Sequence, residues 1–242
     1  MGRTSQRITV SGLPVEVVRK DIKNLHLGVY PPNGRVRVAV PRQMQGEAIR
    51  LVVSTKMGWI KRQQTKFREQ ARQSPREYIY RETHYFLGRS YLLKVVEQTG
   101  PAHVAVRSNT TMELHIPKGA DTAKREQVMQ AWYRRELKAC IPSLIEKWEP
   151  IIGVQVRFWG VKKMKTKWGS CNSEAGRIWL NLELAKKPFQ CLEYIAVHEM
   201  VHLIHRHHDD KFKNLLHQIM PQWQTYRDEL NRAPLGHENW SY

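Results

Sequence analysis

The sequence predicts an α+β protein, with a β-rich part over residues 1–120 and a mixed helical and strand part over residues 121–242. Two observations support this division. Runs in which apolar and polar residues alternate, typical of half-buried strands, are concentrated in the first part, whereas apolar residues three or four positions apart, typical of amphipathic helices, dominate the second. The pattern changes after Pro117-Lys118-Gly119, so we place the boundary near residues 117–122. The sequence shows no internal repeat and no low-complexity tract.

The first part is expected to contain strands around one long helix. Val36, Val38 and Val40 alternate with Arg and Ala just after the turn signal Pro32-Asn33-Gly34, which predicts a hairpin over residues 24–40. Apolar residues from Ile49 onward follow helical spacing and predict a helix over residues 45–73, which Ser74-Pro75 would end. Strand character returns over residues 78–116, most clearly at 85–88 and 91–96.

The second part begins with a helix signal. Asp121 or Thr122 can cap a helix whose apolar face reaches Ile141. Strands are expected over residues 154–158 and 177–182, and helices from Gln190 onward, broken near 206–210 and finished by Pro234.

Composition narrows the class of protein. Hydrophobic residues make up 41% of the 242 residues, which argues against wholesale disorder. No apolar run approaches the roughly 20 residues of a transmembrane helix, and the N-terminal residues lack the apolar core of a secretory signal. Three cysteines do not make a disulfide framework, and Cys140 and Cys191 fall on apolar helix faces. We therefore expect a cytoplasmic protein without a membrane partner.

The charge balance leaves the partner open. The chain carries 40 Lys and Arg against 22 Asp and Glu, a formal net charge of +18. Such an excess indicates either a nucleic acid or other polyanion as partner, or a soluble protein that is simply basic. The basic residues concentrate in two places: Lys61, Arg62, Lys66, Arg68, Arg72 and Arg76, expected on the exposed side of the first helix, and Arg157, Lys162, Lys163, Lys165 and Lys167, which are interleaved with Phe158, Trp159 and Trp168.

The most informative motif is His198-Glu199-x-x-His202 within an apolar helical segment. Two histidines four residues apart share one helix face, so both imidazoles can reach the same ion. Glu199 lies one step around the helix, where it can accept a proton from a water on Zn²⁺, as a general base does. The alternative is a buried helix whose histidines are satisfied by hydrogen bonds.

A catalytic zinc needs a third protein ligand, and His205, His207, His208 and His217 are the candidates. On a straight helix His205 would lie about 10 Å from His198, too far to share the ion. His208 becomes plausible if the helix stops near Arg206 and the chain turns back. Asp209-Asp210 can cap a second helix there, with Phe212, Leu215, Leu216 and Ile219 as its apolar face. Geometry therefore favours His208 over His205 without settling the choice.

The chain resembles the YgjP-like metallopeptidase family, which is itself similar to the SprT-like zinc proteases. The resemblance rests on Lys165–Cys171 (Lys-Thr-Lys-Trp-Gly-Ser-Cys), on Arg177–Asn181, and on the H-E-x-x-H helix followed by His208 and Phe212. It implies a zincin-like fold for the second part and an H-E-x-x-H-x5-H zinc site on His198, His202 and His208, with Glu199 as base. One departure is Arg206-His207, where the family has a small or turn-forming residue, which keeps His207 as a competing ligand.

These observations predict a zinc-dependent metallohydrolase, foremost a metallopeptidase acting on a protein or peptide. A zinc-dependent nucleotide pyrophosphatase is the first alternative, since such activity has been suggested within the family that the chain resembles. The second alternative is a basic nucleic-acid-binding module with a structural, four-ligand zinc that includes Cys171 or His205. Cys171 can otherwise line the cleft or pack beside Trp168 in the core, with Gly169 allowing a tight bend. Tyr226 and His205 are the candidates for oxyanion stabilisation.

Overall fold

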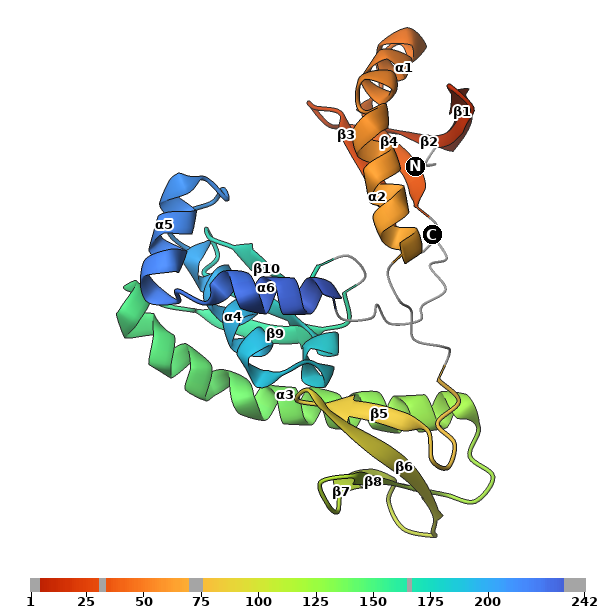
Figure 1. Ribbon diagram of the computed structural model, residues 1–242, viewed down its shortest axis with the longest axis vertical. Coiled ribbons are helices and arrows are strands. Elements are labelled where there is room, and N and C mark those ends of the chain that lie inside the picture. Colours follow the sequence, from red (N-terminus) through yellow and green to blue (C-terminus); the bar gives the residue numbers. More distant parts are fainter. Residues whose placement is uncertain (1–4, 31–33, 70–75, 165–166, 233–242) are drawn as a thin grey trace. The chain divides into compact units, whose positions relative to one another are not determined.

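A computed structural model describes residues 5–30, 34–69, 76–164 and 167–232. These residues form two compact units, one made from the elements between Ser5 and Glu69 and the other from the elements between Arg76 and Arg232 (Figure 1). Both units contain helices and sheets, so the α+β prediction is confirmed. No helix among the described residues is long and apolar enough to cross a membrane.

The first unit is a four-stranded sheet with two helices. Its strand order is β1-β2-β4-β3, with the two outer pairs antiparallel and the central pair β2–β4 parallel. The predicted hairpin is confirmed as β3–β4, and Asn33 of its turn lies outside the described residues. The strands are β1 (Ser5–Val10), β2 (Leu13–Lys20), β3 (His26–Tyr30) and β4 (Arg35–Pro41).

The helix expected over residues 45–73 is divided into α1 (Gly46–Thr55) and α2 (Met57–Glu69), so the prediction of one continuous helix is wrong. The break follows Val52-Val53-Ser54-Thr55, a run of β-branched and hydroxyl residues with low helix propensity. Thr55 Oγ1 also donates to the carbonyl of Leu51, a bond that often bends helices. Residues 70–73 lie outside the described residues. The core of this unit joins the helices to the sheet through Val15, Val17, Val36, Val38, Val40, Ile49, Val53 and Ile60.

The second unit opens with a sheet of the same topology. Its order is β5-β6-β8-β7, again with antiparallel outer pairs and a parallel central pair. Each sheet begins with a two-residue hairpin turn, Ser11-Gly12 in the first and Leu87-Gly88 in the second, and all four residues have positive φ. The two sheets thus repeat one topology, although the sequence shows no internal repeat. The strands are β5 (Thr83–Phe86), β6 (Arg89–Glu97), β7 (His103–Val106) and β8 (Thr111–Ile116).

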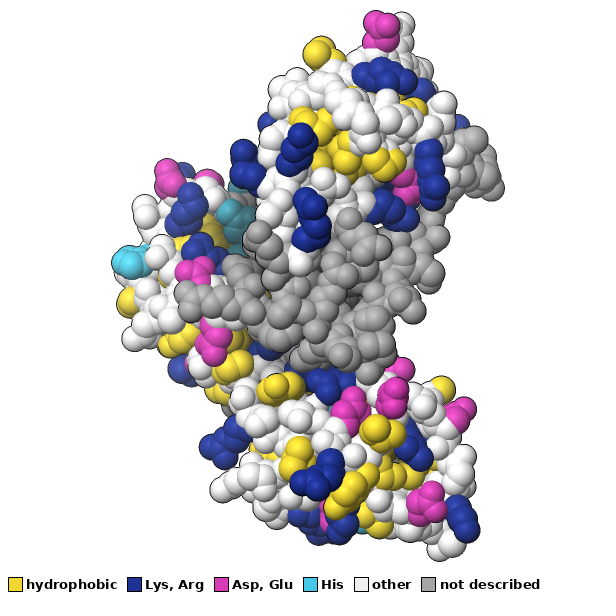
Figure 2. Space-filling model, turned by 45° about the vertical axis from the view of Figure 1, so that its right-hand side comes forward, with side chains coloured by type: hydrophobic (Ala, Val, Ile, Leu, Met, Phe, Trp, Pro, Cys, Tyr) yellow, Lys and Arg dark blue, Asp and Glu magenta, His cyan; other side chains and the backbone are white. Residues whose placement is uncertain are grey.

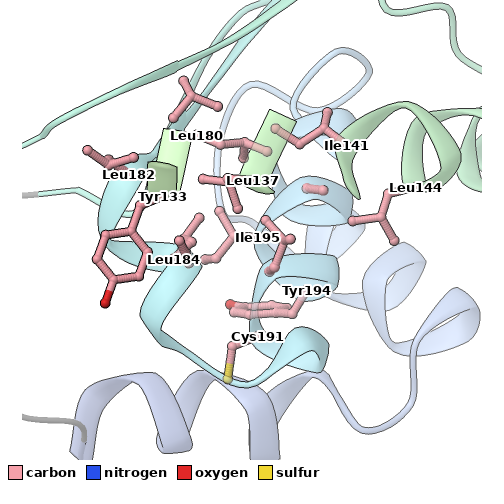
Figure 3. Packing of buried hydrophobic residues seen from close by; sticks show 14 of the residues in the cluster. Tyr133, Leu137, Ile141, Leu144, Leu180, Leu182, Leu184, Cys191, Tyr194 and Ile195 are labelled. Carbon is pink, nitrogen blue, oxygen red and sulfur yellow. The ribbon is translucent and has the colours of Figure 1, made fainter. Parts of the chain in front are cut away.

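The 31-residue helix α3 (Thr122–Ile152) is the central element of this unit. Asp121 is its N-cap, since its carboxylate accepts from the Lys124 amide at 2.7 Å, as predicted. In Figure 1 α3 runs between the β5–β8 sheet and the elements around α4, and it contacts both. Figure 3 shows the core that α3 shares with those elements, which includes Tyr133, Leu137, Ile141, Leu180, Leu184, Tyr194 and Ile195.

Sheet β10-β11-β9 and the last helices complete the unit. The strand expected over residues 154–158 is misplaced, because β9 is Phe158–Lys162. Val154 and Val156 instead pack on the core outside any ladder. The strand expected at 177–182 is confirmed as β11 (Arg177–Asn181), which pairs with β10 (Gly169–Asn172) and β9. Next come the 3₁₀ helix η1 (Leu182–Lys186) and α4 (Phe189–Val201), α5 (Asp210–Ile219) and α6 (Trp223–Arg232); Pro234 lies outside the described residues.

The compact units do not meet at the expected boundary. The division falls between residues 75 and 76, whereas the expected one at 120–121 lies inside the second unit. The reason is burial. Met112, Leu114 and Ile116 of β8 are fully buried in the same core as α3, so the sheet and the helix cannot be separate domains.

Candidate metal centre

Helix α4 carries the H-E-x-x-H motif and is buried on nearly every side. Its apolar residues from Cys191 to Val201 all belong to the core of the second unit. A helix that is apolar all round is held in place by its neighbours, which fixes the direction in which its few polar side chains point. His198 and His202 are half-buried on one face, while Glu199 is only 5% exposed.

The chain turns back after α4 and brings His208 to the motif. The helix ends at Val201, earlier than the expected stop near Arg206, and Asp209 caps α5 by accepting from the Phe212 amide at 3.0 Å. Nε2 of His208 then lies 3.0 Å from Nε2 of His198 and 3.1 Å from Nε2 of His202. The reversal that His208 requires is thus present.

Phe212 supports all three imidazoles. Its ring is 2% exposed, and its centroid lies 5.0 Å from that of His198, 4.6 Å from that of His202 and 4.9 Å from that of His208. Because Asp209 and Phe212 form the first turn of α5, the cap and the aromatic ring together set the position of the third histidine.

The residues present fit a divalent metal ion. In a tetrahedral zinc site with Zn–N bonds near 2.0–2.1 Å, ligand nitrogens lie about 3.3 Å apart, close to the two distances found here. Nδ1 of His202 lies 2.9 Å from the carbonyl of His205; donation to this acceptor leaves Nε2 with the lone pair that a metal needs. Burial, followed by the neighbouring His202 and His208, lowers the pKa of His198 to about 3, which keeps its ring neutral and able to bind.

Glu199 lies directly against the backbone of β10. A Cβ built on Gly169 would be 2.5 Å from Oε1 of Glu199 and 2.6 Å from its Cγ, so only glycine leaves room for this carboxylate. Gly169 has no positive φ and is paired in a strand, so the expected role in a tight bend is wrong. Burial raises the pKa of Glu199 to about 8, and the nearby Lys167 opposes this shift.

A cleft of about 750 Å³ opens over the histidines and Glu199. Strand β10 forms one wall, and it is an edge strand because, among the described strands, only β11 pairs with it. The Asn181 amide donates to the Trp168 carbonyl, so in the alternating antiparallel pattern the backbone groups of Ser170 and Asn172 also face β11. Those of Gly169 and Cys171 therefore face the open edge.

The structure separates the other predicted residues from the three histidines. Within the described part of the chain, the cluster of groups close enough to hold one ion contains only His198, His202 and His208. His205 contributes its carbonyl, and the side chains of His207 and His217 are not among the cleft residues. Tyr226 is also outside the cleft lining, and its hydroxyl lies 3.3 Å from Oε1 of Gln222.

Cys171 lines the cleft but is not in the histidine cluster. It is half-buried and packs against the core, and burial followed by Glu199 raises the pKa of its thiol to about 11, which disfavours the ligating thiolate. Trp168 also packs partly against the core while lining the cleft. Cys191 is fully buried and Cys140 packs against the core, as expected.

Sequence reasoning missed several residues of the cleft. Tyr194 contacts the His198 ring edge-on with centroids 5.7 Å apart, and Arg206 and Arg227 also line the cleft. Tyr194 lies one helical turn before His198, a spacing that could have marked it. Arg227 comes from α6, nearly thirty residues away, and only the tertiary fold brings it here.

Comparisons with known proteins assign the chain to a family. No curated protein matches the chain by sequence. Among solved structures, the crystal structure of the metallopeptidase zymogen of Pyrococcus abyssi abylysin is similar at 20% identity with a TM-score of 0.35, covering 37% of this chain and 90% of that chain. The family model described as "YgjP-like, metallopeptidase domain" matches residues 23–233. The chain belongs to the YgjP-like family and carries its metallopeptidase domain.

Proposed function

We propose that this protein is a zinc-dependent metallopeptidase in which His198, His202 and His208 hold the ion and Glu199 is the general base. The observation that carries the proposal is the convergence of three Nε2 atoms beside a buried carboxylate in an open cleft. Three protein ligands leave one position for water or substrate, which distinguishes a catalytic zinc from a structural one. The described residues offer no fourth ligand in this cluster, which argues against the structural-zinc alternative with Cys171 or His205.

Zinc, when bound, would supply a Lewis acid and lower the pKa of a coordinated water. Glu199 would take a proton from the attacking water and return it to the leaving amine. Its position is fixed from two sides, by the buried helix α4 and by the backbone at Gly169. Such fixed placement reduces the reorganisation that the reaction requires.

The free edge of β10 is the proposed binding site for the peptide backbone. An extended peptide can add to an exposed strand through main-chain hydrogen bonds, independently of its sequence. The outward-facing backbone groups of Gly169 and Cys171 would provide these bonds. Gly169 also contacts Glu199, so a peptide paired here would pass beside the general base.

A nucleotide pyrophosphatase is the second candidate, and one feature of the cleft favours it. Lys167, Arg206 and Arg227 line the cleft, whereas Glu174 and Glu199 are its only acidic lining residues among those described. A cationic cleft would also accept a triphosphate. The two candidates share the metal and the base, so substrate assays must distinguish them.

The decisive variant is Glu199→Gln, with Glu174→Gln as the matched control because Glu174 also lines the cleft. Glu199→Gln should retain one zinc per chain and lose about 10²–10⁴-fold in hydrolysis of an unfolded protein substrate, whereas Glu174→Gln should keep both. Zinc content is measured by elemental analysis and turnover by release of new amino termini. Unchanged turnover in Glu199→Gln would contradict the proposal. Turnover of nucleoside triphosphates alone would favour the second candidate.

A further inference from the structure

The outer face of the β10–β11–β9 sheet carries exposed aromatic side chains. In the parallel β9–β11 register Phe158 is opposite Arg177 and Gly160 is opposite Trp179, and residues directly opposite each other share a face. Phe158 is 48% exposed, a large fraction for a phenylalanine, and Trp179 is partly exposed. The alternate residues point into the core and are buried: Val161, Ile178 and Leu180.

Each aromatic ring on this face has a cation over it. The Arg177 guanidinium lies 5.4 Å from the centre of the Phe158 ring, and Nζ of Lys162 lies 4.7 Å from that of Trp179. The two rings are 5.5 Å apart. A Cβ on Gly160 would be 2.5 Å from the Trp179 ring, so this glycine lets the indole lie over the strand. The result is a continuous row of cation, ring, ring and cation.

The charge of this segment is one-sided. Residues 157–181 contain six Lys or Arg and a single acidic residue, Glu174. Figure 2 shows that Lys and Arg occur over both units, so net charge alone does not distinguish one surface from another. The pairing of two aromatic rings with two cations does, because aromatic rings can stack on bases and the cations over them attract anions.

We propose that the outer face of β9 and β11 binds single-stranded nucleic acid. Lys162 and Arg177 would move from the rings to the phosphates, and bases would stack on Phe158 and Trp179 in their place. An unpaired strand offers both a polyanionic backbone and free base faces. A duplex hides its base faces, and an acidic peptide has the charge without the stacking partners. This face is separate from the histidine cluster, so the inference does not depend on the proposed peptidase activity.

The test uses the full-length protein and fluorescence anisotropy of labelled 12-nucleotide oligothymidylate and oligouridylate. Phe158→Ala should weaken binding about 5- to 150-fold, the range expected for loss of one stacked base. Phe158→Tyr keeps an aromatic ring and should bind as the wild type does. Lys162→Gln should reduce the dependence of log Kd on log salt by about 0.7. The matched control is Phe189→Ala, which removes a phenylalanine 39% exposed at the start of α4 and should leave binding unchanged.

Tighter binding of the deoxy or the ribo strand identifies DNA or RNA as the source, and either supports the proposal. Equal binding of Phe158→Ala and the wild-type protein would overturn it, with circular dichroism confirming that both are folded. Equal affinity for a duplex of the same length, or for polyglutamate, would also overturn it, because charge alone would then explain the binding. Glu199→Gln should bind the strands as the wild type does, which separates this inference from the peptidase proposal.

Discussion

The sheets β1–β4 and β5–β8 have the same topology but different surroundings. In the first, a Cβ on Gly12 of the β1–β2 turn would meet no described atom within 4 Å. In the second, the equivalent Gly88 lies against Pro188, and a Cβ on Gly88 would be 2.8–3.1 Å from atoms of that proline. The neighbouring Leu87 amide donates to the Ala185 carbonyl at 2.8 Å.

This difference shows how one of two similar sheets becomes part of the candidate metal centre. Pro188 is the N-cap of α4, so the β5–β6 turn supports the beginning of the helix that carries His198 and Glu199. Gly169 contacts the same helix at Glu199. The first sheet has its own core with α1 and α2. Among the described residues, none from this sheet belongs to the histidine cluster.

The largest expected effect comes from Gly169→Ala. The added methyl would displace the Glu199 carboxylate, and misplacement of a catalytic group by about 1 Å can cost on the order of 10²-fold in rate. Turnover should fall by that order while zinc is retained. Gly160→Ala is the control, because its methyl would meet Trp179 on the opposite face of the same sheet. Similar turnover in the two variants would show that the contact between Gly169 and Glu199 does not affect the reaction rate.

The paired turns give the next test. Gly12→Ala and Gly88→Ala both place alanine at positive φ, which costs about 1–2 kcal/mol. Gly88→Ala adds a clash with Pro188, worth about 1–3 kcal/mol more in the free energy of unfolding of the second unit. Urea unfolding followed by circular dichroism measures both variants. Equal destabilisation would remove the distinction between the two sheets.

A smaller effect is expected from pH. Burial is the main cause that lowers the pKa of His84 in β5 to about 4, with Arg76 and Lys186 adding to the shift and Glu82 opposing it. The register places Ile8 of β1 at the equivalent position in the first sheet. An unfolded histidine has a pKa near 6.5, so below that pH the unfolded chain takes up a proton that the folded protein does not. The stability that neutral His84 allows is therefore complete above about pH 6.5 and is lost as the pH falls towards 4.

Metal-free protein should therefore lose roughly 1–3 kcal/mol of stability between pH 6.5 and pH 4 through His84. His84→Gln should show a shallower decline than the wild type over that interval. His103→Gln, which changes an exposed histidine of β7, should follow the wild-type curve. Parallel curves for His84→Gln and the wild type would contradict the assignment.

Local signals allowed much of the site to be predicted, and tertiary contacts supplied the rest. The metal motif, the Asp121 cap and the α5 cap at Asp209 depend on residues within one helical turn, so their pattern is readable in the sequence. Gly169 is different, because the need for glycine at this position comes from the Glu199 carboxylate, thirty positions away in the sequence. Val154 and Val156 alternate like strand residues, yet only pairing with β11 determines where β9 begins.

The first basic cluster is likewise predicted only in part. Lys61, Arg62 and Arg68 are exposed on α2, as expected, whereas Lys66 and Arg72 have side chains outside the described residues. Arg76 does not extend this cluster. It belongs to the second unit and donates to the Thr83 carbonyl at 2.5 Å. Helical periodicity does not predict that one compact unit ends at residue 75 and the next begins at residue 76.

The central claim is that His208 completes the metal centre, and zinc affinity tests it most directly. Zinc dissociation constants are compared for the wild type, His208→Ala and His207→Ala by competition with a chromogenic chelator. Loss of His208 should weaken zinc binding by at least about 10-fold, since it removes one of the three proposed protein ligands, whereas His207→Ala should bind as the wild type does. Wild-type affinity in His208→Ala, or a loss confined to His207→Ala, would contradict the account.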